Sequence, residues 1–140
     1  MAFELTAHAE RRLTTDEIAW LTTVTPSGKP LPRPVWFVWD GEAIIIYSLN
    51  GAARLGYIEH NPQVTVHFNS AGGDDIVVIS GTAQVLPDAP PPSQFPGLLD
   101  KYGPLMERIS QAPREQAAKW YDDNYGVAIR VTPERSWGHE

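Results

Sequence analysis

The chain has 140 residues, a length that suits one domain over 1–140, and it contains no cysteine, which excludes disulfides, thiolate metal sites and cysteine nucleophiles. The formal net charge of -6 argues against nucleic acid or an anionic membrane as a partner, because binding to phosphates depends on clustered Lys and Arg. Since apolar runs are short and the start shows no signal-peptide pattern, we expect a soluble cytoplasmic protein.

The first part of the chain predicts helix and then strand. Residues 4–12 predict a short helix, and Thr14 and Glu17 have the spacing of a capping box, which predicts a further helical turn before Ile18. Residues 21–25 predict a strand. The turn at 26–29 contains Pro and Gly and begins a β-meander.

Three prolines then occupy alternate positions, at Pro30, Pro32 and Pro34. Alternate residues of a strand face the same edge, so these prolines remove hydrogen-bond donors from one edge and leave the other edge free to pair. One interpretation is a protected edge strand. The other is that the donor-poor edge opens a slot for a ligand beside the sheet.

Residues 33–48 predict a β-hairpin around Asp40-Gly41, because both flanking runs are rich in β-branched and aromatic residues. By alternation, the first strand carries Val35, Phe37 and Trp39 on one side and Trp36 and Val38 on the other. The second strand divides into Ala43, Ile45 and Tyr47 and into Ile44, Ile46 and Ser48. Because both faces are apolar, we expect the hairpin to be covered twice. A barrel interior would cover one side, and a partner subunit, a helix or a flat ligand the other.

A turn at 48–51 leads into a predicted helix over 52–60, which ends before Asn61-Pro62. The start of such a helix offers free N–H groups and a positive dipole end, and Ser48 and Arg54 lie nearby in the chain. These features outline an anion site. The alternative is that Arg54 is an ordinary solvated arginine on a connecting helix.

The rest of the chain predicts three more strands and a helical insertion. Residues 63–69, 75–86 and 127–132 read as strands, and Gly81 predicts a bulge, a barrel bend or a close backbone approach. Residues 133–138 read as a tail. Residues 93–123 are predicted to be helical, with breaks at Gly103-Pro104 and Pro113 and an apolar stripe of Leu98, Leu99, Tyr102, Leu105, Met106 and Ile109. The fold class is therefore mainly β with helical insertions, a small antiparallel barrel of about six strands.

The residue types exclude several chemistries. The chain has no serine-hydrolase motif and no phosphate-cradling loop, and its histidines lack the spacing of metal ligands, so no metal site is expected. No catalytic side chain can be assigned. A cofactor that carries its own chemistry fits this pattern, because it needs only an apolar wall, backbone hydrogen bonds and an anchor for its tail.

One combination of segments is distinctive. It joins 20–24, Gly28-Lys29-Pro30, 33–41, 46–48, Arg54-Leu55, Asn61-Pro62, 80–83 and 128–135, and so covers nearly the whole chain. In this combination the chain resembles the split-barrel flavin and deazaflavin family related to pyridoxamine 5′-phosphate oxidase, and within it the branch of probable coenzyme F420-dependent reductases.

The resemblance implies a homodimer of six-stranded antiparallel split β-barrels with a cofactor between the subunits, so that the other subunit and the ring would be the second cover of the hairpin. The cofactor would be coenzyme F420 or, alternatively, FMN. The implied cofactor-binding residues are Arg33, Pro34, Val35, Trp36, Tyr47, Ser48, Arg54, Leu55, Ile79 and Gly81. Pro34 to Trp36 would lie along the ring, Tyr47 to Leu55 near the ribityl and phosphate groups, and Ile79 to Gly81 would close the pocket.

The implied activity is hydride transfer between reduced F420 and a small unsaturated or conjugated organic acceptor, with the proton coming from water or Tyr47. Relatives usually carry a basic residue where this chain has Gly56. Losing one charge-assisted hydrogen bond weakens binding by roughly ten- to a hundredfold, which favours F420, with its singly charged phosphodiester, over FMN. The alternatives are an FMN-dependent oxidase or reductase of the same fold and a non-catalytic cofactor-binding barrel.

Overall fold

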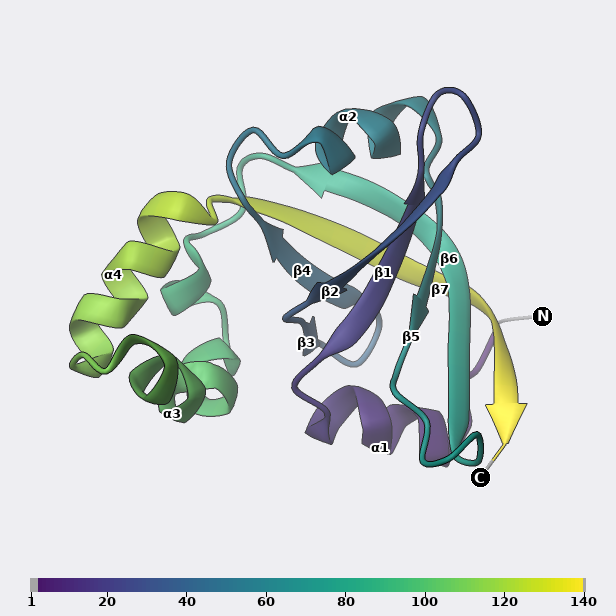
Figure 1. The fold of residues 1–140 in the computed structure, drawn as a ribbon, viewed down its shortest axis with the longest axis horizontal. Coiled ribbons are helices and arrows are strands. Elements are labelled where there is room, and N and C mark those ends of the chain that lie inside the picture. The colour runs from purple at the N-terminus through teal and green to yellow at the C-terminus, as the bar shows by residue number, and fades with distance from the viewer. Residues whose placement is uncertain (1–2, 140) are drawn as a thin grey trace.

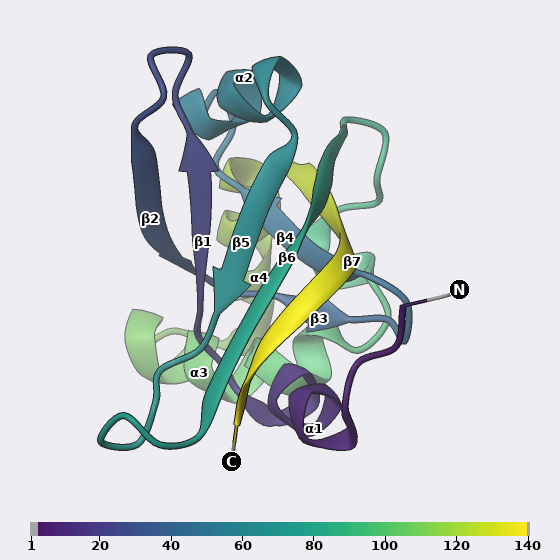
Figure 2. The ribbon, with the colours of Figure 1, turned by 90° about the vertical axis from the view of Figure 1, so that its right-hand side faces the viewer.

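The computed structural model describes residues 3–139, in which seven antiparallel strands form one strongly curled sheet (Figures 1 and 2). The sheet order is β2-β1-β5-β6-β7-β4-β3. The strands are β1 (Ala19–Val24), β2 (Pro30–Val35), β3 (Val38–Trp39), β4 (Ile44–Ser48), β5 (Gln63–His67), β6 (Ile76–Leu86) and β7 (Val127–His139). The mainly β, split-barrel fold predicted from the sequence is confirmed.

Four α-helices and one short 3₁₀ helix accompany the sheet. They are α1 (Ala7–Thr15), α2 (Ala53–His60), η1 (Pro92–Gln94), α3 (Leu98–Ser110) and α4 (Arg114–Asn124). In Figure 1, α1 and α2 lie at opposite ends of the curled sheet, and α3 and α4 form a separate pair beside it. None of the helices within residues 3–139 has the length and apolar character needed to cross a membrane.

The structure has one strand more than expected, because the predicted strand over 33–39 is divided. Its first part, β2, pairs with β1 at one edge of the sheet, whereas β3 pairs with β4 at the opposite edge. Trp36 and Phe37 form the crossover between the two edges. Since β2 pairs only with β1, the prediction of an edge strand protected by Pro30, Pro32 and Pro34 is confirmed.

One hydrophobic core fills the inside of the curled sheet. It contains the inward residues of the hairpin, including Phe37, Ile44 and Ile46, together with Leu13 of α1 and Ile58 of α2. The two helices therefore close the ends of the half-barrel with apolar side chains, in agreement with the predicted first cover of the hairpin.

A second core lies on the other face of the hairpin. Ala43, Ile45 and Tyr47 point into it, as alternation predicted, and α3 and α4 contribute Leu98, Tyr102, Met106, Ala117 and Tyr121. Helices of the same chain thus provide the second cover of β4, rather than the other subunit and a ring, because the chain returns after β6 to pack an amphipathic helix pair there. Only Trp36, which is half-buried, stays partly open on this face.

Two local predictions about helices were wrong. The Thr14 hydroxyl does not cap a new helical turn but bonds to the Glu10 carbonyl inside α1, and Thr6 caps that helix instead. Helix α3 continues through Gly103-Pro104, because the apolar contacts of its buried face outweigh one missing backbone donor. The predicted break at Pro113 is confirmed, since α3 ends at Ser110 and α4 begins at Arg114.

Two further predictions need correction. Ile109, expected in the apolar stripe of α3, is 66% exposed. The expected tail over 133–138 belongs to β7 and pairs with the first half of β6. The register shifts between Ser80 and Gly81, which accommodates Pro133 in the strand and confirms the bulge expected at Gly81.

Candidate functional site

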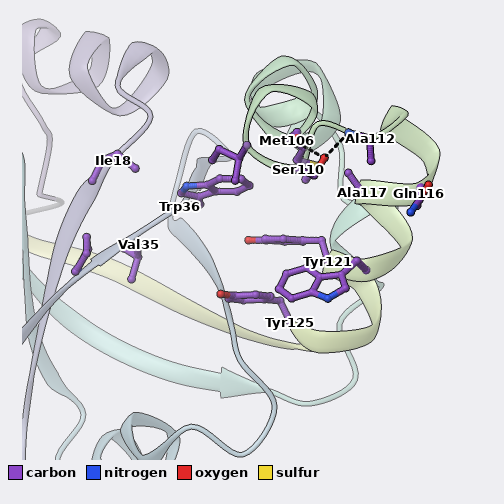
Figure 3. Close-up of a pocket in the computed structure, with 13 residues that line it drawn as sticks. Ile18, Val35, Trp36, Met106, Ser110, Ala112, Gln116, Ala117, Tyr121 and Tyr125 are labelled. Carbon is purple, nitrogen blue, oxygen red and sulfur yellow. Dashed lines mark hydrogen bonds between the residues drawn. The ribbon is translucent and has the colours of Figure 1, made fainter.

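An open cleft of about 660 Å³ lies between the β2 edge of the sheet and the α3–α4 pair (Figure 3). One wall comes from Ile18 and from Pro34, Val35 and Trp36. The opposite wall comes from the helices and the segments that join and follow them: Met106, Ile109, Ser110, Ala112, Gln116, Ala117, Trp120, Tyr121 and Tyr125. Most of these side chains are apolar or aromatic, so the cleft suits a largely apolar, planar ligand.

Four aromatic rings form a continuous stack along this cleft. Trp36 lies between Tyr102, with ring centroids 4.6 Å apart, and Tyr121, with centroids 5.4 Å apart. Tyr121 in turn stacks on Tyr125 at 4.6 Å. Figure 3 shows Trp36, from the sheet side, above Tyr121 and Tyr125, from the helical side. Because both faces of Trp36 are occupied, Trp36 presents its edge rather than a free face to the cleft.

The crossover that carries Trp36 is held by two side chains of α3. The Tyr102 hydroxyl accepts a hydrogen bond from the Phe37 N–H at 2.8 Å, and its single proton is shared between the carbonyls of Phe37 and Glu17. The Lys101 ammonium donates to the Phe37 carbonyl at 3.0 Å. Burial raises the pKa of both Tyr102 and Tyr121 well above the usual range, so both rings stay neutral at physiological pH.

Two arginines lie close together near the Tyr125 end of the stack. Arg54 on α2 is half-buried, and its pKa is lowered first by burial and then by the positive charge of Arg33, while Tyr125 acts in the opposite direction. Within residues 3–139 no carboxylate forms an ion pair with Arg54. Arg33 is exposed and bonds only to the carbonyl of the neighbouring Pro32. This pair of positive charges is therefore uncompensated inside the described chain, which is the electrostatic requirement of an anion site.

The structure brings together half of the residues that the resemblance implied. Pro34, Val35 and Trp36 line the cleft. Arg33 and Arg54 do not line it, but they lie near each other, and Arg54 interacts electrostatically with the lining residue Tyr125. Helix α2 begins after Ala52, which provides no side-chain cap, so its first N–H groups stay without a side-chain partner.

The other half lies apart from the cleft. Leu55 packs against the barrel core, Ile79 is fully buried in that core, and Gly81 lies at the bulge. Ser48 is 1% exposed, and its hydroxyl donates to the Leu49 carbonyl. Tyr47 is buried and donates to the Pro90 carbonyl, and burial together with Asp122 raises its pKa to about 12.

Sequence reasoning missed the helical wall of the cleft. Tyr121 and Tyr125 line the cleft. Tyr121 falls within the helical insertion predicted over 93–123, and Tyr125 lies in no predicted element. Their spacing of four residues at the end of α4 is a signal that could have found them, since residues four apart lie on one face of a helix. In the described part of the chain, no three His, Asp or Glu residues gather in a way that could hold a metal ion.

Comparisons with known proteins place this geometry in a family. Residues 5–139 match the family model described as pyridoxamine 5′-phosphate oxidase. A solved F420 reductase is 24% identical with a TM-score of 0.69, over 95% of this chain and 98% of the other. The heme storage protein HutZ from Vibrio cholerae is 16% identical with a TM-score of 0.57, over 94% and 89% of the two chains.

General Stress Protein 26 from Bacillus anthracis is similar at 18% identity and a TM-score of 0.62, over 93% of this chain and 89% of the other. A comparison with curated proteins found no significant match. At these identities the solved structures support the fold, whereas the family model spans almost the full length. The chain therefore belongs to the pyridoxamine 5′-phosphate oxidase family.

Proposed function

We propose that this protein is an oxidoreductase that uses reduced coenzyme F420 to reduce a small unsaturated or conjugated organic acceptor. The observation that carries the proposal is an apolar, aromatic cleft together with the neighbouring pair Arg33 and Arg54, of which Arg54 interacts electrostatically with Tyr125 in the wall of the cleft. Proteins of this family bind flavin-type cofactors, which are planar rings with an anionic tail. The similar F420 reductase supports the choice of F420 among them.

The residues of the site fit such a cofactor. Arg54 loses hydration on burial and is repelled by Arg33, so an anionic group between them would relieve an unfavourable arrangement. Relatives usually carry a basic residue at the position of Gly56. A Cβ added to Gly56 would meet no atom within 4 Å. A phosphodiester with one charge requires less compensation than a terminal phosphate with nearly two, which favours F420 over FMN.

In this proposal the protein contributes position and environment. The reduced cofactor supplies the hydride when it is bound. The strand from Pro34 to Trp36 forms a rigid wall, since Trp36 is stacked on both faces and Phe37 is held by α3. The apolar side chains of the cleft orient the planar ring, and Arg54 with Arg33 binds the anionic tail.

Water, rather than Tyr47, is the proton source consistent with this geometry. The Tyr47 hydroxyl is buried, engaged by the Pro90 carbonyl and made a weaker acid by the rise of its pKa to about 12. The cleft, by contrast, is open to solvent along its exposed rim at Ile109 and Trp120. Water in the open cleft can therefore protonate the acceptor, and no side chain has to act as a general acid.

The proposal is tested by titrating the purified protein with F420 and with FMN while following fluorescence, and then by measuring oxidation of reduced F420 with conjugated acceptors. Arg54→Ala is expected to weaken F420 binding by roughly ten- to a hundredfold, which corresponds to about 1.5–3 kcal/mol for a charge-assisted hydrogen bond. The matched control is Arg11→Ala, an exposed arginine on α1, which lies at the opposite end of the sheet from α2 (Figure 1). If Arg54→Ala binds F420 as tightly as the wild type does, Arg54 does not contribute to the binding site.

The same experiment separates the two alternatives. An FMN-dependent oxidase or reductase would bind FMN more tightly than F420, and Gly56→Arg should then strengthen FMN binding further, because the space at this position is open. A non-catalytic cofactor-binding barrel would bind a cofactor without turnover on any acceptor. The similarity of the fold to a heme storage protein makes heme a third ligand to include in the titration.

A further inference from the structure

The hydroxyl of Tyr121 is a polar group without a protein partner in the wall of the cleft. Tyr121 is only 7% exposed and belongs to the second core. Its ring stacks on Trp36 and on Tyr125. Among residues 3–139, however, no group forms a hydrogen bond with its hydroxyl. Buried polar groups of folded proteins nearly always have a hydrogen-bond partner, so this hydroxyl points to a partner from outside the described chain.

This hydroxyl is reached from the cleft. Every fully buried side-chain oxygen within residues 3–139 has a hydrogen-bond partner, so a hydroxyl that lacks one must be accessible from outside the protein. Tyr121 lines the cleft, and Figure 3 shows its oxygen pointing away from α4, toward the side of the cleft where Val35 lies. The small accessible part of Tyr121 therefore includes its polar end.

The other polar side chains of the cleft offer a ligand less. The Ser110 hydroxyl is already engaged, since it donates to a backbone carbonyl of its own helix. The Gln116 amide lies on an exposed part of α4. Tyr125 is half-buried and interacts electrostatically with Arg54, the residue assigned to the anionic tail. Tyr121 therefore provides the enclosed and unengaged hydrogen-bonding group among these side chains.

Such a group distinguishes between ligands of the same shape. Burial raises the pKa of Tyr121, so the hydroxyl keeps its proton and can donate it to a hydrogen bond. A ligand that fills the cleft takes the place of solvent at this hydroxyl. An oxygen on the ligand restores the lost hydrogen bond, whereas a hydrocarbon leaves the hydroxyl unpaired in an apolar place, which weakens binding.

We propose that Tyr121 is a specificity-determining residue, whose hydroxyl donates a hydrogen bond to an oxygen of the acceptor. The inference rests on the proposed function, in which the cofactor ring lies along the strand from Pro34 to Trp36, so that the acceptor faces the helical wall. The cleft then selects conjugated acceptors that carry a hydrogen-bond-accepting oxygen and discriminates against hydrocarbons of the same shape.

The test uses Tyr121→Phe, which keeps the stacked ring and removes only the hydroxyl. The probes are α-tetralone and tetralin, because they differ by one carbonyl group on the same bicyclic frame. Isothermal titration calorimetry of the full-length wild type, with oxidised F420 present, is expected to show that the ketone binds about three- to tenfold more tightly than the hydrocarbon. In Tyr121→Phe the two affinities should become equal. The matched control is Tyr57→Phe, which removes a hydroxyl on α2 outside the cleft and should keep the wild-type preference.

Two further measurements separate selection of the acceptor from other roles of the hydroxyl. The affinity of Tyr121→Phe for F420 should equal that of the wild type, because the hydroxyl is assigned to the acceptor. The urea concentration at the midpoint of unfolding should also be unchanged, because the hydroxyl has no hydrogen-bond partner among residues 3–139. A merely structural role of Tyr121 would shift this midpoint and leave the preference for the ketone intact.

Each outcome decides the inference. A wild type without a preference for the ketone overturns it, and so does a Tyr121→Phe variant that keeps the preference. A loss that appears in F420 binding instead also overturns it, because the hydroxyl would then serve the cofactor. A preference that depends on Tyr121 in a protein that does not bind F420 supports the selecting role of Tyr121 and contradicts only the proposed function.

Discussion

At the scale of single residues, the wall of the cleft depends on the peptide group of Phe37. This peptide lies between two strands that pair at opposite edges of the sheet, and the sheet ladder provides no partner for it. Tyr102 supplies both a donor and an acceptor, and Lys101 supplies a second donor. Buried N–H and C=O groups of Phe37 without hydrogen-bond partners would destabilise the folded state. The two side chains of α3 that supply these partners therefore determine where Trp36 lies.

Tyr102→Phe is expected to lower the free energy of unfolding by about 1–3 kcal/mol, because the Phe37 N–H loses its acceptor in a buried place while the stacked ring remains. Urea denaturation followed by circular dichroism measures this change. Tyr57→Phe is the control, since Tyr57 is partly exposed on α2. If both variants unfold at the same urea concentration as the wild type, the Tyr102 hydroxyl does not hold the crossover.

Lys101 also makes stability depend on pH. Its pKa is about 8 in the folded protein and 10.5 in the unfolded chain, so between these values the unfolded state binds more protons and stability rises with pH. The free energy of unfolding of the wild type, relative to Lys101→Met, should therefore increase from about pH 7 to about pH 9.5, below the ionisation of unfolded tyrosines. Denaturation at several pH values checks this, with Lys119→Met as the control that shows no such gain. A constant difference would contradict the lowered pKa.

At the scale of elements, the bulge between β6 and β7 is a tightly constrained point of the sheet. Gly81 pairs with Pro133, and a Cβ added to Gly81 would lie 2.3 Å from the Thr132 carbonyl oxygen. Neither strand can move away without breaking the longest ladder of the sheet. The bulge therefore lets β7 continue past Pro133, where the sequence alone predicted a tail.

Gly81→Ala is expected to destabilise the protein by more than about 1 kcal/mol, because the backbone must shift to remove the clash. Gly56→Ala on α2 is the matched control, because a Cβ there meets nothing within 4 Å and alanine favours the helix by about 0.5–1 kcal/mol. Thermal unfolding of both variants measures the two changes, which should have opposite signs. Equal melting temperatures would show that the strands yield at the bulge.

At the scale of the whole molecule, the outer face of the curled sheet carries a row of cross-strand neighbours, and within residues 3–139 the helices lie behind or at the ends of these strands (Figure 2). Trp20 of β1 pairs with His67 of β5, His67 with Val78 of β6, and Val78 with Trp137 of β7. Trp20 and His67 stack, and Trp137 is 64% exposed. We propose that a second copy of the chain covers this row, which gives the homodimer implied by the family resemblance.

Val78→Glu is expected to raise the dimer dissociation constant at least tenfold, because it would bury an unpaired charge at the centre of the row. Sedimentation velocity over a range of protein concentrations measures the change. Ile109→Glu is the control, since Ile109 is exposed on α3 and lies outside the row. A wild-type protein that sediments as a monomer at every concentration would contradict the proposed dimer.

The sequence by itself determined most of the strands, the turn at Asp40-Gly41, the two apolar faces of the hairpin and the edge position of β2, but not the division of 33–39 or the second half of β7. These features depend on local alternation and on backbone chemistry, which neighbouring residues specify. The resemblance of the motifs determined the family. It also pointed to Pro34, Val35 and Trp36, which line the cleft, and to Arg54, which interacts with the lining residue Tyr125.

Only the tertiary structure decided what covers the second face of the hairpin and what closes the cleft. Tyr121 and Tyr125 reach Trp36 from more than eighty residues away in the chain, through the packing of α3 and α4 on β4. The same helices bury Tyr47, whereas Ile79 is buried inside the curled sheet. Contacts between distant segments depend on how whole faces pack, and no local pattern of the sequence contains that information.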